Sequence, residues 1–352
     1  MSDVATYEIA PGYTISRVIR GGWQLAGGHG AIDRAMAIED LTAAFDAGIF
    51  TYDSADIYTG VEVLYGAFRA QILRSRGSAA AGRIRVHTKF VPDLERLASL
   101  ARSDIETVVD RSLHRLQTDR LDLVQFHWWD YAQPRWLEAL HWLDRLLAKG
   151  KISHIGATNF DTPHVAAIID AGIPLVSLQV QYSALDRRPQ NGLAALCAKH
   201  AIALLCYGSV AGGFLSDRWL GAPEPADPVG NRSLVKYKLI IDDFGGWALF
   251  QELLAALRSV ADRHQADIAT IASAYVLAKP GVAAVIVGAR NRAHAGANAN
   301  AAKLVLTTQD LAAIASVVAR ARGPLGDVYA LERDRDGRHG SIMKYNLNAK
   351  AS

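Results

Sequence analysis

The chain of 352 residues has little cysteine: only Cys197 and Cys206 occur, both in apolar surroundings. Two thiols cannot form a disulfide framework, and no spacing typical of a metal site is present. No apolar run approaches the roughly 18 residues of a membrane-spanning helix, and the first residues lack the features of a secretory signal. We therefore expect a cytoplasmic protein with buried free thiols, no membrane span and no bound metal.

The sequence also lacks a large excess of positive or of negative residues. The 38 Lys and Arg residues against 35 Asp and Glu residues give a formal net charge of +3, and no long basic run occurs. Nucleic-acid binding requires a clustered basic face, so nucleic acid is not an expected partner. Half of the residues are hydrophobic, which is enough to bury a sizeable core. The sequence leaves the oligomeric state open.

Apolar segments of strand length alternate with longer segments of helical periodicity. The predicted strands are Arg17–Gly22, Ile49–Asp53, Arg85–Lys89, Leu121–His127, Ile152–Ala157, Leu175–Gln181, Ala201–Tyr207 and Val282–Gly288. The predicted helices are Val61–Arg74, Leu100–Leu116, Pro134–Leu147, Thr162–Asp170, Asn191–His200, Trp247–His264 and Gln309–Ala321. Eight such units favour a closed (β/α)8 TIM barrel over an open sheet. No GxGxxG follows a strand, which counts against a Rossmann fold.

The segments outside this regular pattern are predicted to lie at the two ends of the barrel. Thr6–Ser16 reads as a small hairpin over the barrel bottom, with a Pro-Gly turn. The Gly/Pro-rich loop Gly212–Gly230 is long enough to be a lid or binding loop at the C-terminal face. We interpret residues 1–352 as one domain, with its core at about 17–323 and an irregular tail at 324–352.

Four ionisable residues follow consecutive predicted strands. Asp53, Lys89 and His127 end three strands in turn, and Tyr58 lies in the loop after the first of them. In a TIM barrel these strand ends meet at the face where active sites lie. Each residue alone has an ordinary explanation as a helix cap, a solvated lysine or a core histidine. Together, at matching strand ends, they indicate an active site.

Seven segments carry a resemblance to a known family: TYDSADIY, VHTKF, DLVQFHWWD, IGATNF, LQVQYS, CYGSVAGGFL and VAAVIVGARNRAHAGAN. In this order, from about Arg17 to Asn298, they resemble the aldo-keto reductase family. The resemblance implies a (β/α)8 barrel that binds a nicotinamide cofactor without a Rossmann fold. It also implies a reversible, NAD(P)H-dependent reduction of an aldehyde or ketone.

Elementary chemistry gives the four residues separate roles in such a reaction. A phenol has an ordinary pKa near 10, and a neighbouring ammonium lowers that pKa by favouring the phenolate. We expect Lys89 to act on Tyr58 in this way, while Asp53 holds Lys89. Tyr58 is then a general acid toward the carbonyl oxygen. His127 is expected to donate a hydrogen bond to the same oxygen.

The resemblance also implies where the cofactor binds. Thr158, Asn159 and Gln179 match positions that hold the nicotinamide carboxamide, which needs both donors and acceptors. Tyr207 matches the aromatic residue that stacks on the nicotinamide ring. The other implied contacts, from the nicotinamide to the adenosine end, are Gly22, Trp23, Asp53, Gly208, Ser209, Val210, Gly288, Arg290, His294 and Asn298.

The choice between NADP(H) and NAD(H) depends on the adenosine end. Arg290 is suited to a 2′-phosphate because a guanidinium group binds phosphate with two hydrogen bonds. Three departures from the family's pattern oppose this: Gly288-Ala289 stands where some members carry a Lys-Ser pair, His294 where an arginine is often found, and Ala297 where many members carry an acid. On balance we expect NADP(H) rather than NAD(H).

Tryptophans accompany the four residues. Trp23 follows two glycines, and Trp128 and Trp129 follow His127 directly. Packing in the hydrophobic core is the ordinary role of a tryptophan, and it could explain each of these three. However, adjacent strand residues point to opposite faces, so at least one of the pair is expected at the barrel mouth. The predicted substrate contacts are Trp23, Tyr58, His127, Trp128 and Trp129.

Three other functions stay open at this point. One is an NAD-dependent sugar or alcohol dehydrogenase of the same family. Another is a Schiff-base aldolase with Lys89 as nucleophile, against which the dinucleotide-type motifs argue. The last is a cofactor-binding regulatory subunit, like the channel β-subunits that resemble this family, which can keep all four residues.

Overall fold

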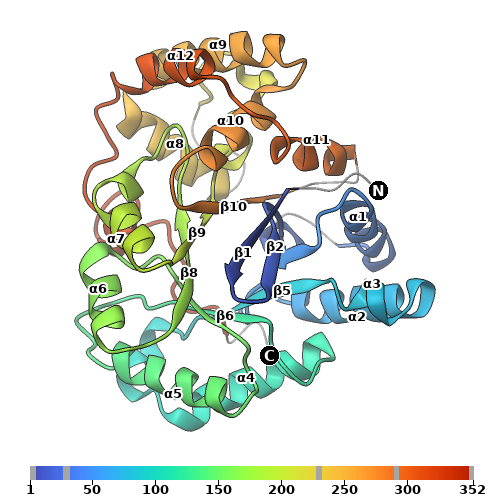
Figure 1. Ribbon diagram of the computed structural model, residues 1–352. Helices are drawn as coiled ribbons and strands as arrows, with labels where there is room; N and C mark the ends of the chain where they lie inside the picture. Colours follow the sequence, from blue (N-terminus) through green and yellow to red (C-terminus); the bar gives the residue numbers. More distant parts are fainter. Residues whose placement is uncertain (1–4, 27–31, 227–231, 289–292, 349–352) are drawn as a thin grey trace.

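Eight parallel strands form a closed barrel, so the predicted (β/α)8 fold is confirmed (Figure 1). The structure is a computed structural model that describes residues 5–26, 32–226, 232–288 and 293–348. Around the barrel the order is β10-β3-β4-β5-β6-β7-β8-β9. The strands are β3 (Val18–Gly21), β4 (Thr51–Asp53), β5 (Arg85–Phe90), β6 (Leu123–Phe126), β7 (Ile155–Thr158), β8 (Leu175–Gln181), β9 (Ala203–Tyr207) and β10 (Val282–Val287).

Helices surround the barrel and cover the outer faces of the strands. They are α1 (Arg34–Asp46), α2 (Val61–Arg76), α3 (Ser78–Ala81), α4 (Arg102–Leu116), α5 (Trp136–Ala148), α6 (Thr162–Asp170), α7 (Leu193–Lys199), α8 (Arg232–Phe244), α9 (Trp247–Arg263), α10 (Ile268–Leu277), α11 (Ala293–Ala301), α12 (Thr308–Val318) and α13 (Ala330–Arg333). All seven predicted helices are present, with ends that differ by a few residues. α5, for example, begins at Trp136, so Pro134 precedes the helix and is not in its first turn.

The connection between β9 and β10 is more helical than the sequence indicates. Besides the predicted α9 it contains α8 and α10, which pack with it and α12 into an apolar cluster outside the barrel. Every residue of α10 except Ala269 is buried. Because this helix has no polar face, it lacks the periodicity that reveals an amphipathic helix. Helix α1 was also not expected.

The predicted hairpin is confirmed, and it closes one end of the barrel (Figure 1). Its strands are β1 (Thr6–Ala10) and β2 (Tyr13–Ser16), paired antiparallel. Ile9, Tyr13 and Ile15 are buried against apolar side chains that point into the barrel, among them Leu123 and Leu205. The bottom of the barrel is therefore filled, and the polar interior lies at the other end.

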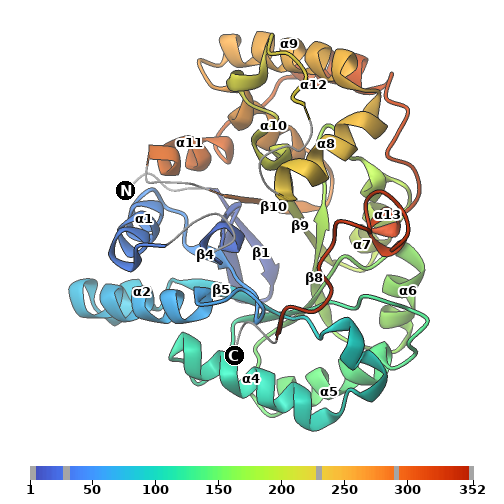
Figure 2. The ribbon, with the colours of Figure 1, turned by 180° about the vertical axis from the view of Figure 1, so that it is seen from behind.

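The C-terminal segment crosses that other end. Figure 2 shows it, in dark red, passing in front of β8 and carrying α13. Its last described part is fixed by Asp93, whose Oδ1 accepts hydrogen bonds from the backbone N–H groups of Leu347 and Asn348 at 2.7 and 3.0 Å. Within the described part of the chain, no helix is both long and apolar enough to cross a membrane.

Candidate active site

Asp53 and Lys89 form a buried ion pair at the C-terminal ends of β4 and β5. Their residues are 4% and 6% exposed. Lys89 Nζ donates to both carboxylate oxygens of Asp53 at 2.7 Å and to the carbonyl oxygen of Ser54 at 2.8 Å. Burial lowers the pKa of Lys89, and the Asp53 carboxylate opposes that change. All three ammonium hydrogens thus have an acceptor, which is how a buried charge is tolerated.

Two glutamines complete the hydrogen bonding of Asp53. Gln179 Nε2 donates to Asp53 Oδ1 at 2.7 Å and to Gln125 Oε1 at 3.1 Å. Gln125 Nε2 reaches the same Asp53 oxygen at 3.3 Å. The structure therefore places Gln179 beside the ion pair, and it adds Gln125, which the sequence analysis missed. The available signal was its position two residues before His127, on the same side of β6.

Tyr58 lies beside Lys89, in the loop that follows β4. Lys89 Nζ is 5.1 Å from the centre of the Tyr58 ring. The ring meets Trp23 edge-on, with 5.2 Å between ring centroids. Trp23 reaches this position because Gly22 packs closely: a Cβ there would lie 2.5 Å from the carbonyl oxygen of Asp53. The structure thus brings Gly22, Trp23, Tyr58 and Lys89 together.

The expected effect of Lys89 on Tyr58 is wrong for this structure. Burial raises the pKa of Tyr58 well above its ordinary value of 10, and the Asp53 carboxylate raises it further. The physical reason is that Asp53 neutralises the ammonium of Lys89 at close range, so little of its positive charge acts on the phenol. Tyr58 is consequently a fully protonated phenol at neutral pH.

His127 faces the same site from the end of β6, and it is 2% exposed. Its Nδ1 lies 3.2 Å from the carbonyl oxygen of Thr158, which only accepts, so Nδ1 carries the ring proton. Burial, with a contribution from Arg333, lowers the pKa of His127 to about 3. The ring is therefore neutral, and its buried Nε2 has no partner in the described structure. Nε2 is then a hydrogen-bond acceptor, not the donor expected from the sequence.

The two adjacent tryptophans point in different directions. Trp129 meets the His127 ring edge-on at 4.2 Å between centroids, and its Nε1 donates to the carbonyl oxygen of Pro92. Trp128 is completely buried, packs against Phe126, and donates to carbonyl oxygens in the following loop. Both indoles belong to the same apolar cluster, but only Trp129 contacts His127, so Trp129 is placed at the site and the expected substrate contact of Trp128 is not supported.

The residues expected to hold the nicotinamide lie at neighbouring strand ends. Thr158 ends β7, and Asn159 follows it with a left-handed backbone, φ 62°. Tyr207 ends β9, and its hydroxyl donates to Asn159 Oδ1 at 2.9 Å. Gly208 has φ +76°, and a Cβ there would lie 2.6 Å from the hydroxyl of Tyr237. Only glycine fits this turn without strain.

The other residues expected to contact the cofactor lie just after β9, at the end of β10 and in α11. The Oγ of Ser209, a fully buried residue, lies 3.3 Å from that of Ser273, and the half-buried Val210 follows it. Gly288 is exposed and lies against the amide of Gln24. Asn298 is half-buried in α11. Arg290 and the side chain of His294 lie outside the described residues.

The tail supplies site residues that the sequence analysis missed. Tyr329 is 4% exposed and meets the His127 ring edge-on, with 5.6 Å between centroids. Arg333 Nη2 donates to the carbonyl oxygens of Trp128 at 3.1 Å and Asn159 at 2.8 Å. No residue pattern distinguishes these two from an ordinary polar tail, so the sequence held no usable signal.

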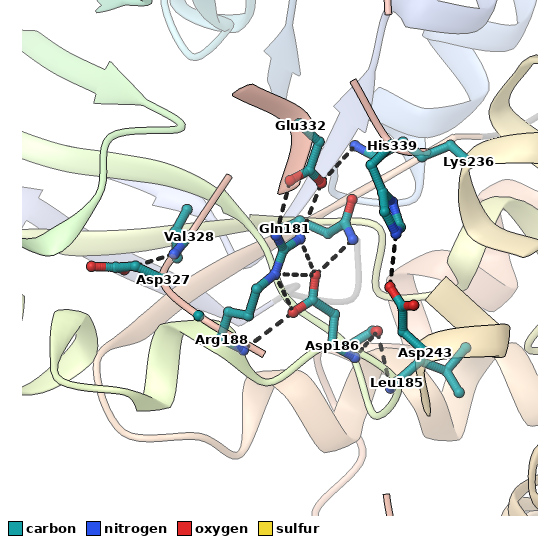
Figure 3. Close-up of polar contacts among 12 residues, drawn as sticks. Gln181, Leu185, Asp186, Arg188, Lys236, Asp243, Asp327, Val328, Glu332 and His339 are labelled. Atoms are coloured by element: carbon teal, nitrogen blue, oxygen red, sulfur yellow. Dashed lines mark hydrogen bonds and ion pairs between the residues drawn. The ribbon is translucent and has the colours of Figure 1, made fainter. Parts of the chain in front are cut away.

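A buried charge cluster attaches the tail to the barrel (Figure 3). Arg188 donates to both oxygens of Glu332 at 2.8 and 3.0 Å and to Asp186 at 2.7 Å. Gln181 Nε2 adds a hydrogen bond to Asp186 at 2.7 Å. Burial alone would raise the pKa of Glu332, but Arg188 outweighs it and lowers this pKa to about 2. Glu332 is therefore a carboxylate at neutral pH.

Comparisons with known proteins agree with this geometry. The sequence pattern of the Aldo/keto reductase family matches residues 17–319. Flagellar radial spoke protein 5 of Chlamydomonas reinhardtii is 31% identical over 255 residues, 62% of this chain and 47% of that protein, so the chain spans about half its length. An NADH-specific methylglyoxal reductase of Escherichia coli (strain K12) is 27% identical over 298 residues, 78% of this chain and 86% of that protein.

A solved structure shows the same architecture. A thermostable aldo-keto reductase has a TM-score of 0.68 and 25% identity, over 89% of this chain and 99% of that chain. The family pattern covers every strand of the barrel and the strand ends that carry Asp53, Lys89 and His127. The chain therefore belongs to the aldo-keto reductase family, whose members are NAD(P)H-dependent oxidoreductases.

Proposed function

We propose that the protein reversibly reduces an aldehyde or ketone to an alcohol, with Tyr58 as the general acid and NADP(H) as the preferred cofactor. One observation carries the proposal: a protonated phenol stands beside a neutralised Lys89–Asp53 pair, and at the end of the strand next to that of Lys89 the buried Nε2 of His127 has no partner among the described residues. An unpartnered buried nitrogen at a strand end supports a site built for a polar reactant atom.

Several features of the chain support a bound nicotinamide. Thr158, Asn159 and Gln179 offer the mixed donors and acceptors that a carboxamide requires, and Tyr207 provides an aromatic ring at the end of β9. The left-handed turn at Gly208 lets the backbone approach a pyrophosphate closely. When bound, the cofactor supplies a hydride to the carbonyl carbon.

The protein's own residues handle the proton. Tyr58 holds it on Oη and donates it to the reactant oxygen as that oxygen gains negative charge. The phenolate that remains lies beside the Lys89–Asp53 pair, whose ammonium stabilises it only weakly because Asp53 neutralises most of its charge. Nε2 of His127 orients the reactant, and it suits the hydroxyl of an alcohol because that group donates. In alcohol oxidation, Tyr58 takes the proton back.

The same geometry opposes the aldolase alternative. A Schiff base requires a neutral amine with a free lone pair. Lys89 instead points its three hydrogens at two Asp53 oxygens and one carbonyl oxygen, as a charged ammonium does. Asp53 favours that charged form.

The proposal is tested by turnover with aldehydes, ketones and sugars, each assayed with NADPH and NADH at constant pH. Tyr58→Phe removes only the phenolic proton, so carbonyl reduction is expected to fall about 100-fold or more. Cofactor binding, followed by fluorescence, should be retained. Tyr7→Phe at an exposed position serves as the control. Near-normal kcat in Tyr58→Phe would contradict the general-acid assignment.

A further inference from the structure

Lys236 places a second ammonium at the barrel mouth, outside the four residues already described. It belongs to α8, in the long connection between β9 and β10. Its Nζ lies 5.1 Å from the ring centre of Tyr207, 5.8 Å from that of Tyr237 and 5.9 Å from that of Tyr329. Tyr329 in turn contacts His127. The ammonium is thus one aromatic ring away from the reacting groups.

The nearby carboxylates do not use this ammonium as a hydrogen-bond donor. Both oxygens of Glu332 already accept from Arg188, which also holds Asp186 (Figure 3). Lys236 Nζ is 3.9 Å from Glu332 Oε1, too far for a hydrogen bond. Nothing in the described part of the chain accepts a hydrogen bond from Nζ. The side chain is 15% exposed, so an incoming acceptor can reach it.

A second cation contacts the same tyrosine. The guanidinium carbon of Arg333 lies 5.2 Å from the centre of the Tyr329 ring. Its charge, after burial, contributes to lowering the pKa of His127. Lys236 and Arg333 thus place two positive charges around Tyr329, partly offset by the Glu332 carboxylate, and Lys236 keeps ammonium hydrogens that can bind a negatively charged reactant.

We propose that Lys236 binds an anionic oxygen that a reactant brings to the mouth, in the first place the carboxylate of an acidic aldehyde or ketone. The substrate class then rests on the proposed function. The cofactor's pyrophosphate is a second source of anionic oxygens for Lys236. Tyr207 and Tyr237, which Lys236 contacts, also border the turn at Gly208 that is proposed to approach the pyrophosphate. Tyr329 and Arg333 favour the substrate as the source.

The test compares Lys236→Met, which keeps the length but removes the charge, with Lys236→Arg. Lys238→Met is the matched control, since Lys238 lies on the same helix, is 13% exposed, and pairs with Glu224 and Asp242 at 2.6 and 2.7 Å. Three quantities are measured: kcat/KM for 4-carboxybenzaldehyde relative to benzaldehyde, calorimetric binding of benzoate, and the Kd values of NADPH and NADH.

Lys236→Met should reduce the preference for the carboxylated aldehyde, and the affinity for benzoate, roughly tenfold to a hundredfold, the range of one charge-assisted hydrogen bond. Lys236→Arg should retain much of both, and Lys238→Met should match the wild type. A loss confined to the Kd of both cofactors would support anion binding with the pyrophosphate as its source.

Lys236→Met that changes none of the three quantities would overturn the proposal. Benzoate binding needs no turnover, so it separates this inference from the proposed function. If the wild-type protein reduces no carbonyl compound but binds benzoate through Lys236, the inference stands and the proposed function fails.

Discussion

The ring of Tyr329 meets the ring of His127 edge-on, with 5.6 Å between their centroids. Tyr329 begins the short segment that contains Glu332, and Glu332 is held by Arg188 at the end of the barrel. The buried ion pair and the ring contact are therefore parts of one attachment. Loss of the ion pair should move Tyr329 away from His127.

Glu332→Gln should destabilise the protein and weaken substrate binding. The substitution leaves Arg188 with Asp186 alone and removes the carboxylate nearest to Lys236. Because Arg188 keeps Asp186 as its charge partner, the cost is that of buried hydrogen-bond donors left without a carboxylate, about 1–3 kcal/mol. We expect a loss of this size in urea unfolding, together with a raised KM because the tail no longer holds Tyr329 in place.

The control for this prediction is Glu252→Gln. Glu252 pairs with Arg320 on the surface, with side chains 48% and 58% exposed, and exposed pairs contribute little. No measurable change in stability or KM is expected. If Glu332→Gln behaves like this control, the charge cluster does not hold the tail.

Lys89→Met should abolish activity and also destabilise the fold. The change leaves the Asp53 carboxylate buried, with only the amides of Gln179 and Gln125 as donors. The expected cost is about 3–5 kcal/mol. The double variant Asp53→Asn with Lys89→Met removes the unpaired charge, so it should regain stability without regaining activity. A double variant no more stable than Lys89→Met alone would contradict this account of the pair.

The sequence predicted those parts of the site that are tied to strand ends. The spacing of Asp53, Lys89 and His127 along three successive strands fixes their convergence once the barrel is recognised. The barrel itself follows from eight apolar strands alternating with helices. Trp129 beside His127 follows from the alternation of side chains along a strand.

What the sequence did not predict depends on contacts between distant segments. Tyr329 and Arg333 reach the mouth with the tail that the Arg188–Glu332 ion pair holds, and neither residue of that pair has a pattern that indicates its partner. Lys236 reaches it from α8, a helix that the sequence pattern did not predict. The pKa of Tyr58 was predicted in the wrong direction because burial and the position of Asp53 decide it. The hydrogen-bonding role of His127 depends on one carbonyl oxygen, that of Thr158.

Acid should destabilise the protein through His87, which lies below Lys89 inside the barrel. Burial first, then the charge of Lys89, lowers the pKa of His87 to about 3 from its ordinary 6.5. The unfolded chain therefore binds a proton below pH 6.5 that the folded chain does not. Stability is complete above pH 6.5 and is lost as the pH falls toward 3.

Between pH 7 and pH 5 this histidine alone should remove roughly 2 kcal/mol of stability. In His87→Gln, the difference in unfolding free energy between the two pH values should be smaller by about that amount. His114→Gln, at an exposed position of α4, should behave as the wild type. An unchanged pH dependence in His87→Gln would show that the folded protein protonates His87 normally.

A single residue, Arg290, is expected to decide the choice between NADP(H) and NAD(H). Arg290 lies outside the described residues, just after β10, where the family places the adenosine ribose. A 2′-phosphate brings roughly two negative charges, and a charge-assisted hydrogen bond to it is worth about 1.5–3 kcal/mol. Arg290→Ala should therefore weaken NADPH binding roughly tenfold to a hundredfold and NADH binding little. Salt screens exposed charges, so the difference should shrink at high ionic strength. Equal loss for both cofactors, or equal affinity in the wild type, would favour NAD(H), the cofactor named for the Escherichia coli relative.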